Sequence, residues 1–180
     1  PVTFGPLTLR NRTIRSAAFE SMCPGNAPSD MLLNYHRSVA AGGIGMTTVA
    51  YAAVTRSGLS FDRQLWMRPE IIPGLRRLTD AVHAEGAAAG IQLGHCGNMS
   101  HKSICGCTPV GASGGFNLYS PTFVRGLRAD ELPELARAYG RSVNLAREAG
   151  FDAVEIHAGH GYLISQFLSP ATNHRKDEFG

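Results

Sequence analysis

Two histidines and a tyrosine lie close together near the end of the chain. His157, His160 and Tyr162 follow the apolar run 153–156, which carries a single acid, Glu155. An apolar run, a turn with glycines and then a helical pattern are typical of a buried strand that leads into a helix. Because α/β folds bind their ligands at the carboxyl ends of strands, we expect these three side chains to lie at the edge of an active site.

The two histidines could instead bind a metal ion together with residues of the loop after the strand 87–93. Metal-binding histidine pairs usually lie on one face of a helix or on a rigid hairpin, whereas here Gly159 and Gly161 shape a turn around His157 and His160. The spacing Cys-Gly-Cys also matches no standard zinc pattern. We therefore expect no metal site at the two histidines or at the loop positions Cys96, His101, Cys105 and Cys107, and a free thiol in a loop is more often inert.

The composition is that of an ordinary globular chain. Of its 180 residues 43% are hydrophobic and 17% are charged, so it can bury a core without disulfide bridges. The net charge of +3 is scattered, and no block of like charge could follow a nucleic-acid backbone. No apolar run approaches the roughly 18 to 20 residues that span a bilayer. We expect a cytoplasmic protein with reduced cysteines that binds neither nucleic acid nor membranes.

Apolar runs and helical periods alternate along the chain. A strand is predicted to begin near Thr13 and to continue through the small residues 16–19. The irregular stretch 98–129 is long enough to indicate an active-site loop, with a hairpin around 122–127. The other predicted elements are a helix that Ser29 and Asp30 cap and Gly42 ends, a strand at 44–54, a helix at 71–82, a strand at 87–93, and a helix that Asp130 caps and Gly150 ends.

This order of elements is the pattern of parallel βα units. The chain has four such units, and a complete parallel (β/α)₈ TIM barrel needs about 250 residues. We therefore expect residues 1–180 to form the first half of a TIM barrel, without a separate second domain. The last residues also lie within a loop that no closing element follows.

Several sequence blocks occur in one order along this chain. The most specific is Glu-Ile-His-Ala-Gly-His-Gly-Tyr-Leu at 155–163, which continues into 166–170 and 173–180. Weaker blocks precede it, namely Pro-Leu-Thr-Leu-Arg-Asn-Arg at 6–12, Gly-Gly-Ile-Gly at 42–45 and Ile-Gln-Leu-Gly-His at 91–95. Together they resemble the old yellow enzyme family, the NADH:flavin oxidoreductases that bind FMN on a (β/α)₈ barrel. The resemblance covers the whole chain but about half of the family's barrel.

The resemblance implies a role for each residue of the first cluster. His157 and His160 match the pair that hydrogen-bonds the carbonyl oxygen of the substrate, and Tyr162 matches the tyrosine proposed to deliver a proton to the carbon skeleton. The chemistry agrees, because hydride addition to an activated alkene builds negative charge on the carbonyl oxygen. An N–H donor lowers that barrier by about 3 kcal/mol if oxyanion-hole values apply. A phenol with a pKa of about 10 remains protonated at neutral pH.

The resemblance also implies residues around the FMN cofactor. Gln92 matches the glutamine that hydrogen-bonds the pyrimidine edge of the flavin, where an amide can both donate and accept. The segment beside the isoalloxazine ring and the end of the second strand are matched by Ala17, Ala18, Phe19, Ala50 and Tyr51. Ordinary core packing would explain the last three of these residues equally well.

Two classes of function remain open. The first is an FMN-dependent oxidoreductase in which NADH or NADPH reduces the flavin and hydride passes to an α,β-unsaturated carbonyl compound; an amine dehydrogenase or demethylase is a variant of the same fold. The second is a non-catalytic half-barrel, either a fragment or a domain that associates with another half. A half-barrel exposes a strand edge and apolar surface, so we expect the chain to form a homo-oligomer or to be unstable alone.

Overall fold

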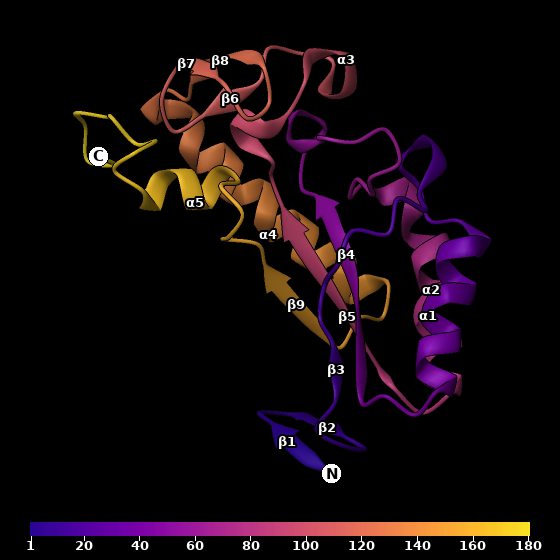
Figure 1. Ribbon diagram of the computed structural model, residues 1–180. Coiled ribbons are helices and arrows are strands. Elements are labelled where there is room, and N and C mark those ends of the chain that lie inside the picture. The colour runs from indigo at the N-terminus through magenta and orange to yellow at the C-terminus, as the bar shows by residue number, and fades with distance from the viewer.

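A four-stranded parallel sheet forms the centre of the protein in a computed structural model that describes residues 1–180 (Figure 1). Its strands lie in the order β3-β4-β5-β9, so the order in space follows the order along the chain. Successive βα units of a barrel produce this arrangement, and four of them make the predicted half. The strands are β3 (Ile14–Arg15), β4 (Met46–Ala53), β5 (Ala88–Gly94) and β9 (Ala153–Ile156).

Each of these strands is followed by a helix. The helices are α1 (Asp30–Ala41), α2 (Ile72–Ala84), α4 (Leu132–Glu148) and the shorter α5 (Leu163–Leu168). The period predicted for α2 is confirmed, because Leu75, Leu78 and Val82 are all buried in the core that the sheet shares with its helices. The predicted cap of α1 is also confirmed, since Ser29 Oγ accepts a hydrogen bond of 3.2 Å from Leu32 N–H.

The first strand is shorter than predicted. Only Ile14 and Arg15 pair with β4, and the small residues 16–19 pair with no strand. The reason is a side chain: the Glu20 carboxylate accepts the Ala50 N–H of β4 at 3.2 Å, in the place where a continuing strand would supply a backbone carbonyl. The chain therefore leaves the sheet after Arg15 and passes beside the carboxyl end of β4.

Two further expectations are wrong. The helix α4 begins at Leu132 rather than at an Asp130 cap, because Glu131 accepts the Arg128 N–H at 2.8 Å and holds Ala129–Glu131 in a preceding 3₁₀ turn. The strand β9 is not buried, because it lies at the edge of the sheet and pairs only with β5. Its last residue, Ile156, is 45% exposed.

The stretch 98–129 folds into a small second sheet beyond the carboxyl ends of β4 and β5 (Figure 1). The antiparallel pairing of β7 with β8 confirms the predicted hairpin. A single-turn helix, too short to give a period in the sequence, precedes this sheet. The elements are α3 (Lys102–Cys105), β6 (Val110–Gly111), β7 (Gly115–Asn117) and β8 (Thr122–Gly126), and the short 3₁₀ turns of the chain are Pro24–Asn26, Arg56–Gly58, Pro69–Ile71, Gly97–Met99 and Ala129–Glu131.

The cysteines are free thiols, as predicted. Burial raises the pKa of Cys23 and that of Cys96 to about 12, so both remain protonated and unreactive at neutral pH. No helix combines the length and the apolar character that crossing a lipid bilayer requires.

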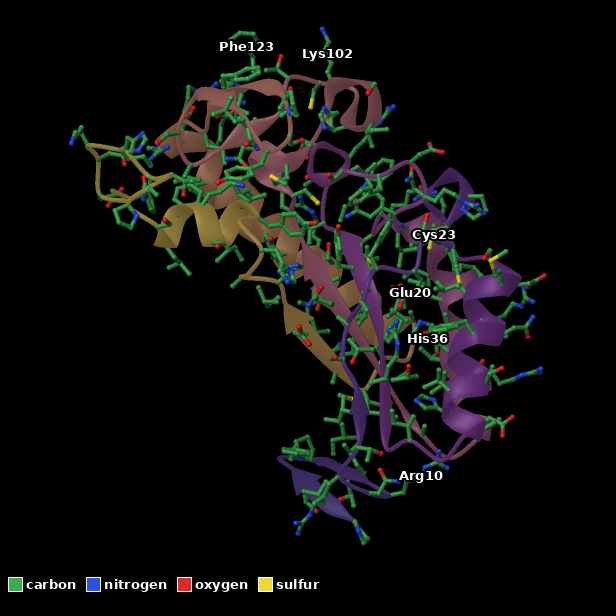
Figure 2. The ribbon with its side chains drawn as sticks, in the orientation of Figure 1. Arg10, Glu20, Cys23, His36, Lys102 and Phe123 are labelled. Carbon is green, nitrogen blue, oxygen red and sulfur yellow. The ribbon has the colours of Figure 1, made fainter.

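One arginine joins three segments at the amino-terminal end of the sheet. Arg10 follows the hairpin of β1 (Val2–Phe4) and β2 (Leu7–Leu9) and lies close to the ends of α1 and α2 (Figure 2). Its guanidinium donates to the carbonyls of Ile44 at 2.8 Å, of Glu85 at 2.7 Å and of Ala40 at 2.5 Å. The last two are carbonyls at helix C-termini, where the helix dipole also favours a cation; the Ala40 carbonyl accepts a backbone N–H from Gly43 as well, at 2.9 Å.

We expect Arg10→Ala to lower the free energy of unfolding by about 2 kcal/mol, because three charge-assisted hydrogen bonds to backbone carbonyls are lost. Arg10→Lys should restore less than half of the loss, since an ammonium group cannot reach three diverging acceptors. Urea unfolding of the purified protein measures both changes. Arg37→Ala is the matched control, an exposed arginine of α1 without a side-chain hydrogen bond. Equal effects at positions 10 and 37 would contradict the prediction.

Candidate active site

The predicted strand-turn-helix lies at the carboxyl edge of the sheet. His157 N–H continues the strand ladder by donating to Leu93 O at 2.8 Å, and its ring is buried. The chain then turns sharply, with left-handed backbone at His160 (φ +56°) and at Gly161 (φ +68°). The turn closes with a 3.1 Å hydrogen bond from Tyr162 N–H to Gly159 O. His157, His160 and Tyr162 are thus brought together, as predicted from the sequence.

The two histidines form a hydrogen-bonded pair. Gly159 N–H donates to His157 Nδ1 at 3.2 Å, which assigns the ring proton of His157 to Nε2. His157 Nε2 lies 3.2 Å from His160 Nδ1, so it donates there and the proton of His160 is assigned to its Nε2. Burial, with a smaller effect from His160, lowers the pKa of His157 and keeps its ring neutral. In this arrangement His160 Nε2–H is the donor left for a ligand.

The tyrosine of the turn is paired with a second tyrosine. The hydroxyl oxygens of Tyr162 and Tyr51 lie 2.6 Å apart, and the Tyr51 ring also meets His157 edge-on at 5.5 Å between centroids. Burial raises the pKa of Tyr162, and its hydrogen bond with Tyr51 opposes that rise. Burial likewise raises the pKa of Tyr51, and the hydrogen bond with Tyr162 adds to it. Either hydroxyl can donate in this bond, and a Tyr162 phenolate would accept from the Tyr51 hydroxyl.

A bulge in β4 places Tyr51. Val49 pairs with Ile91 and Ala52 with Leu93, so three steps along β4 match two along β5. The extra residue interrupts the ladder and turns a side chain toward the edge of the sheet. The preceding residue, Ala50, lies beyond the end of the β3 pairing, and the Glu20 carboxylate accepts its N–H.

The Glu20 carboxylate belongs to a buried polar group between the sheet and α1 (Figure 2). Arg15 Nη1 donates to it at 2.8 Å, and His36 Nε2 lies 3.3 Å away without hydrogen-bond alignment. The His36 Nδ1 atom bonds the Thr47 hydroxyl at 2.8 Å. No sequence pattern indicated this group, because its members are separated along the chain. The only signal was their residue types, an acid and two basic residues that could form an ion pair.

The residues matched to the isoalloxazine side of the flavin form a common surface. Ala50 and Tyr51 are buried together with Cys96, and Ala17 and Phe19 pack against them. Phe19 lies 5.5 Å from the Tyr51 ring and stacks at 4.6 Å on Phe61. Ala18 is exposed, and its carbonyl accepts a hydrogen bond from Arg15 at 3.2 Å. Small side chains at these positions leave room for a flat ring against the strand ends.

Gln92 is paired with a neighbouring strand. Its Nε2 donates to the Glu155 carboxylate, which lies directly across from it in the β5–β9 register. Its Oε1 atom has no hydrogen-bond partner and is not fully buried. The Glu155 carboxylate of β9 thus satisfies the Nε2 end of the Gln92 amide. The Oε1 end can still accept a hydrogen bond from a ligand.

A cavity of about 540 Å³ opens beside the histidine turn. The turn contributes His160 and Gly161, and the hairpin of β7 and β8 contributes its residues 116–119; the remaining lining residues are Asn98, Met99 and Thr172. Gln166 holds the turn against the loop after β5, because its Nε2 donates to Gly161 O at 2.7 Å and to Asn98 Oδ1 at 2.9 Å. The sequence placed Gln166 in a matching block but gave it no role.

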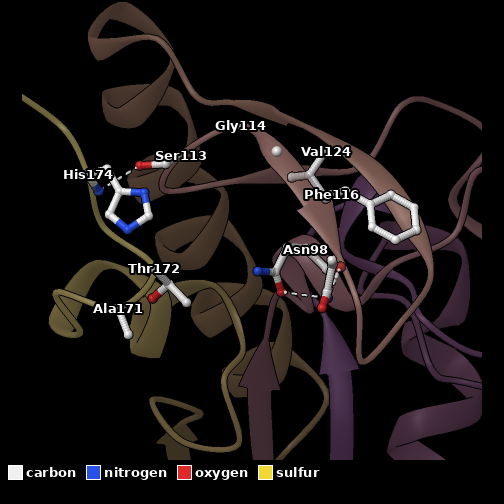
Figure 3. A pocket seen from close by; sticks show the side chains of 10 residues that line it. Asn98, Ser113, Gly114, Phe116, Val124, Ala171, Thr172 and His174 are labelled. Carbon is white, nitrogen blue, oxygen red and sulfur yellow. Dashed lines mark hydrogen bonds between the residues drawn. The ribbon is translucent and has the colours of Figure 1, made fainter.

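The C-terminal block 173–180 holds the hairpin in place. His174 N–H donates to Ser113 Oγ at 2.8 Å across a smaller hollow of about 130 Å³ (Figure 3). Arg175 donates to Leu127 O and, at 3.1 Å, to Ala112 O, and its charge is paired with Asp177. These contacts give the block 173–180 a structural role, since they join the segment after α5 to the residues on either side of the β7–β8 hairpin.

His95 has a structural role. Gly97 N–H donates to its Nδ1 at 3.0 Å, and its Nε2 bonds the Ser57 hydroxyl at 3.1 Å, so both ring nitrogens are satisfied. Burial lowers the pKa of His95 to about 4. The structure contains no group of three or more His, Cys, Asp or Glu side chains that could hold a metal ion.

Comparison with known sequences gives matches over the whole chain. The model of the NADH:flavin oxidoreductase / NADH oxidase family matches residues 1–180. The chain is 44% identical over 180 residues to the 4,4'-dithiodibutanoate disulfide reductase of Rhodococcus erythropolis, and it covers 45% of that protein. It is 38% identical over 179 residues to an NADPH dehydrogenase of Listeria monocytogenes, with 97% of this chain and 52% of that protein covered.

Comparison with solved structures agrees. The old yellow enzyme homologue from Zymomonas mobilis superposes with a TM-score of 0.93 and 29% identity, over all of this chain and 53% of that one. The chain spans about half the length of the relatives it matches, and its four βα units are half of a TIM barrel. FMN is the cofactor of these proteins, with NADH or NADPH as the reductant. The chain therefore belongs to the NADH:flavin oxidoreductase / NADH oxidase family.

Proposed function

We propose that the protein is an ene-reductase, in which FMN, reduced by NADH or NADPH, supplies hydride to the β-carbon of an α,β-unsaturated carbonyl compound. The observation that carries this proposal is the grouping of the histidine pair and the tyrosine pair at one turn, whose His160 lines a cavity of about 540 Å³. Alkene reduction needs a donor for an oxygen and an acid for a carbon, and this grouping provides both.

We propose that residues 1–180 provide the ring-binding half of one barrel domain. The small side chains of Ala17, Ala18 and Ala50, with Phe19 and Tyr51, would hold the flavin ring, and Gln92 Oε1 would accept from its pyrimidine edge. The unpartnered Oε1 atom supports this fit. In TIM barrels the phosphate usually lies by the loops after strands seven and eight. The residues described here therefore fit the ring of FMN rather than its phosphate.

The histidine pair would bind the carbonyl oxygen of the substrate. His160 Nε2–H is free to donate, and its other nitrogen is fixed by His157 Nε2. The His157 ring is in turn fixed by Gly159 N–H. A donor that is oriented before the substrate arrives needs no reorganisation as negative charge develops on the oxygen.

The tyrosine pair would deliver the proton to the α-carbon. Tyr162 is protonated at neutral pH, since burial raises its pKa. After it transfers the proton its phenolate would be buried, and the Tyr51 hydroxyl at 2.6 Å would stabilise that charge. Tyr51 thus contributes to the acid rather than only to the wall beside the flavin.

A second candidate reaction is the reduction of a small organic disulfide. The observation that favours it is the 44% identity with a 4,4'-dithiodibutanoate disulfide reductase. The same cavity would bind the disulfide, and the tyrosine pair would protonate one departing thiolate.

An amine dehydrogenase or demethylase, or a half-barrel that acts only by association, remains an alternative for the same chain. The free edge of β9 supports association with a second half or a second copy.

We expect the purified protein to bind FMN and its reduced flavin to be reoxidised anaerobically by a cyclic enone. His160→Ala should slow this reoxidation about 100-fold, as expected for loss of one oxyanion donor, and leave flavin reduction by NADPH unchanged. Stopped-flow absorbance follows both half-reactions. His174→Ala is the control, because its ring is exposed and only its backbone N–H is used. Reoxidation by a disulfide but not by the enone would favour the second candidate instead.

We expect Tyr162→Phe to abolish proton delivery and Tyr51→Phe to slow it about tenfold, the value of one hydrogen bond of about 1.4 kcal/mol. The wild-type rate should stay constant as the pH rises through neutrality and fall only above the raised pKa of Tyr162. Because Tyr51 lowers that pKa, Tyr51→Phe should move the alkaline fall to higher pH. The solvent isotope effect on enone reduction measures the proton step. A fall at lower pH in Tyr51→Phe would contradict the stabilisation of the Tyr162 phenolate by Tyr51.

A further inference from the structure

A pair of thiols lies outside the proposed flavin site. Cys105 ends the single turn α3 and Cys107 follows after Gly106, which has left-handed backbone at φ +78°. This turn folds the chain back, and the two Sγ atoms are 3.9 Å apart. A disulfide requires about 2.05 Å, so a movement of about 2 Å would close the bond. Gly106 has no side chain to oppose that movement.

The two thiols differ in access. Cys105 is buried, and its Sγ lies 3.2 Å from Cys107 O. Cys107 is partly exposed and lines a cavity of about 510 Å³, together with Thr55, Thr108 and Arg125. A small molecule can therefore reach Cys107 first, and Cys105 is positioned behind it. This arrangement differs from that of Cys23 and Cys96, which are single and buried.

An unpaired cation lies beside this pair. A Cβ added to Gly106 would lie 3.3 Å from Arg56 Nη2, so the guanidinium lies against the glycine between the cysteines. Arg56 is exposed and forms no ion pair, whereas Arg125, which lines the cavity beside Cys107, is paired with Glu131. A carboxylate on an incoming molecule would find Arg56 free to bind it.

We propose that Cys105 and Cys107 form a thiol–disulfide exchange site that reduces a small acidic disulfide and closes as an intramolecular disulfide. Cys107 thiolate attacks one sulfur of the disulfide, whose S–S bond breaks and releases the first thiolate. Cys105 then attacks Cys107 Sγ and releases the second. The two cysteines lose two electrons and two protons, and the two released thiols gain them. The exchange requires neither FMN nor NADPH, so it is independent of the function proposed above.

The pH dependence follows from the environment of Cys107. Burial, and then the neighbouring Cys105, raise the pKa of Cys107, while Arg125 and Arg56 oppose the rise. The thiolate is the nucleophile, so the rate of exchange should increase as the pH rises toward this raised pKa.

Glutathione disulfide is the probe, added to the purified protein without NADPH. Wild type should lose two hydrogens in mass and release two glutathione molecules per chain. Cys105→Ser should stop at one glutathione held on Cys107, and Cys107→Ser should not react. Peptide mapping should find Cys23 and Cys96 unmodified in all three. A persistent glutathione adduct on wild type, an unreactive wild type, or equal modification of Cys23 or Cys96 would overturn the proposal.

Arg56→Gln tests the charge of the ligand. It should slow exchange with glutathione disulfide about fivefold more than exchange with 2-hydroxyethyl disulfide, which is uncharged, because the effect of Arg56 on the pKa of Cys107 is common to both probes; equal slowing with both probes would overturn the acidic class of ligand. Lys102→Gln is the matched control, since it removes an exposed cation of α3 that points away from the fold (Figure 2). Equal rates of Arg56→Gln and wild type with both probes would also overturn the acidic class of ligand.

Alkylation of native wild type by iodoacetamide should occur first at Cys107.

Discussion

A buried carboxylate holds the carboxyl edge of the parallel sheet together. Glu20 accepts hydrogen bonds from Arg15 and from Ala50 N–H, and His36 of α1 lies beside it. The side chain of Glu20 is 3% exposed, and such burial of a charge requires a cation and further donors. Without this carboxylate the bulged part of β4 would have a buried N–H without a partner. The position of the next residue, Tyr51, therefore depends on an acid from a different segment.

The proposed chemistry needs groups from three strands at one edge. Tyr51 comes from β4, Gln92 from β5, and the histidine turn follows β9. Parallel pairing brings these carboxyl ends together, although Tyr51 and Tyr162 are 111 residues apart in the sequence. Gln166 then ties the turn to the loop after β5, and Arg175 ties the following segment to the hairpin. The sheet positions the groups, and the polar side chains around it fix their orientation.

The sequence predicted the elements whose signals are local. The buried face of α2, the Ser29 cap and the strand-turn-histidine order follow from periods of apolar residues and from glycines. It did not predict the end of β3 at Arg15 or the start of α4 at Leu132, because side chains of Glu20 and Glu131 replaced backbone partners there. Nor did it predict the bond between Tyr51 and Tyr162, which depends on a one-residue bulge. The roles of His157 and His160 were implied by the family resemblance. Their mutual hydrogen bond is seen only in the structure.

The contacts of Arg10 have a consequence for the order of folding. Its three acceptors are 30, 34 and 75 residues away along the chain. They converge only after α1 and α2 have packed on the sheet, because two of them are the exposed carbonyl ends of those helices. Contacts at such separation carry a large cost of loop closure and are formed after local ones. We therefore expect the docking of the N-terminal hairpin through Arg10 to follow the packing of α1 and α2, rather than to belong to the folding nucleus.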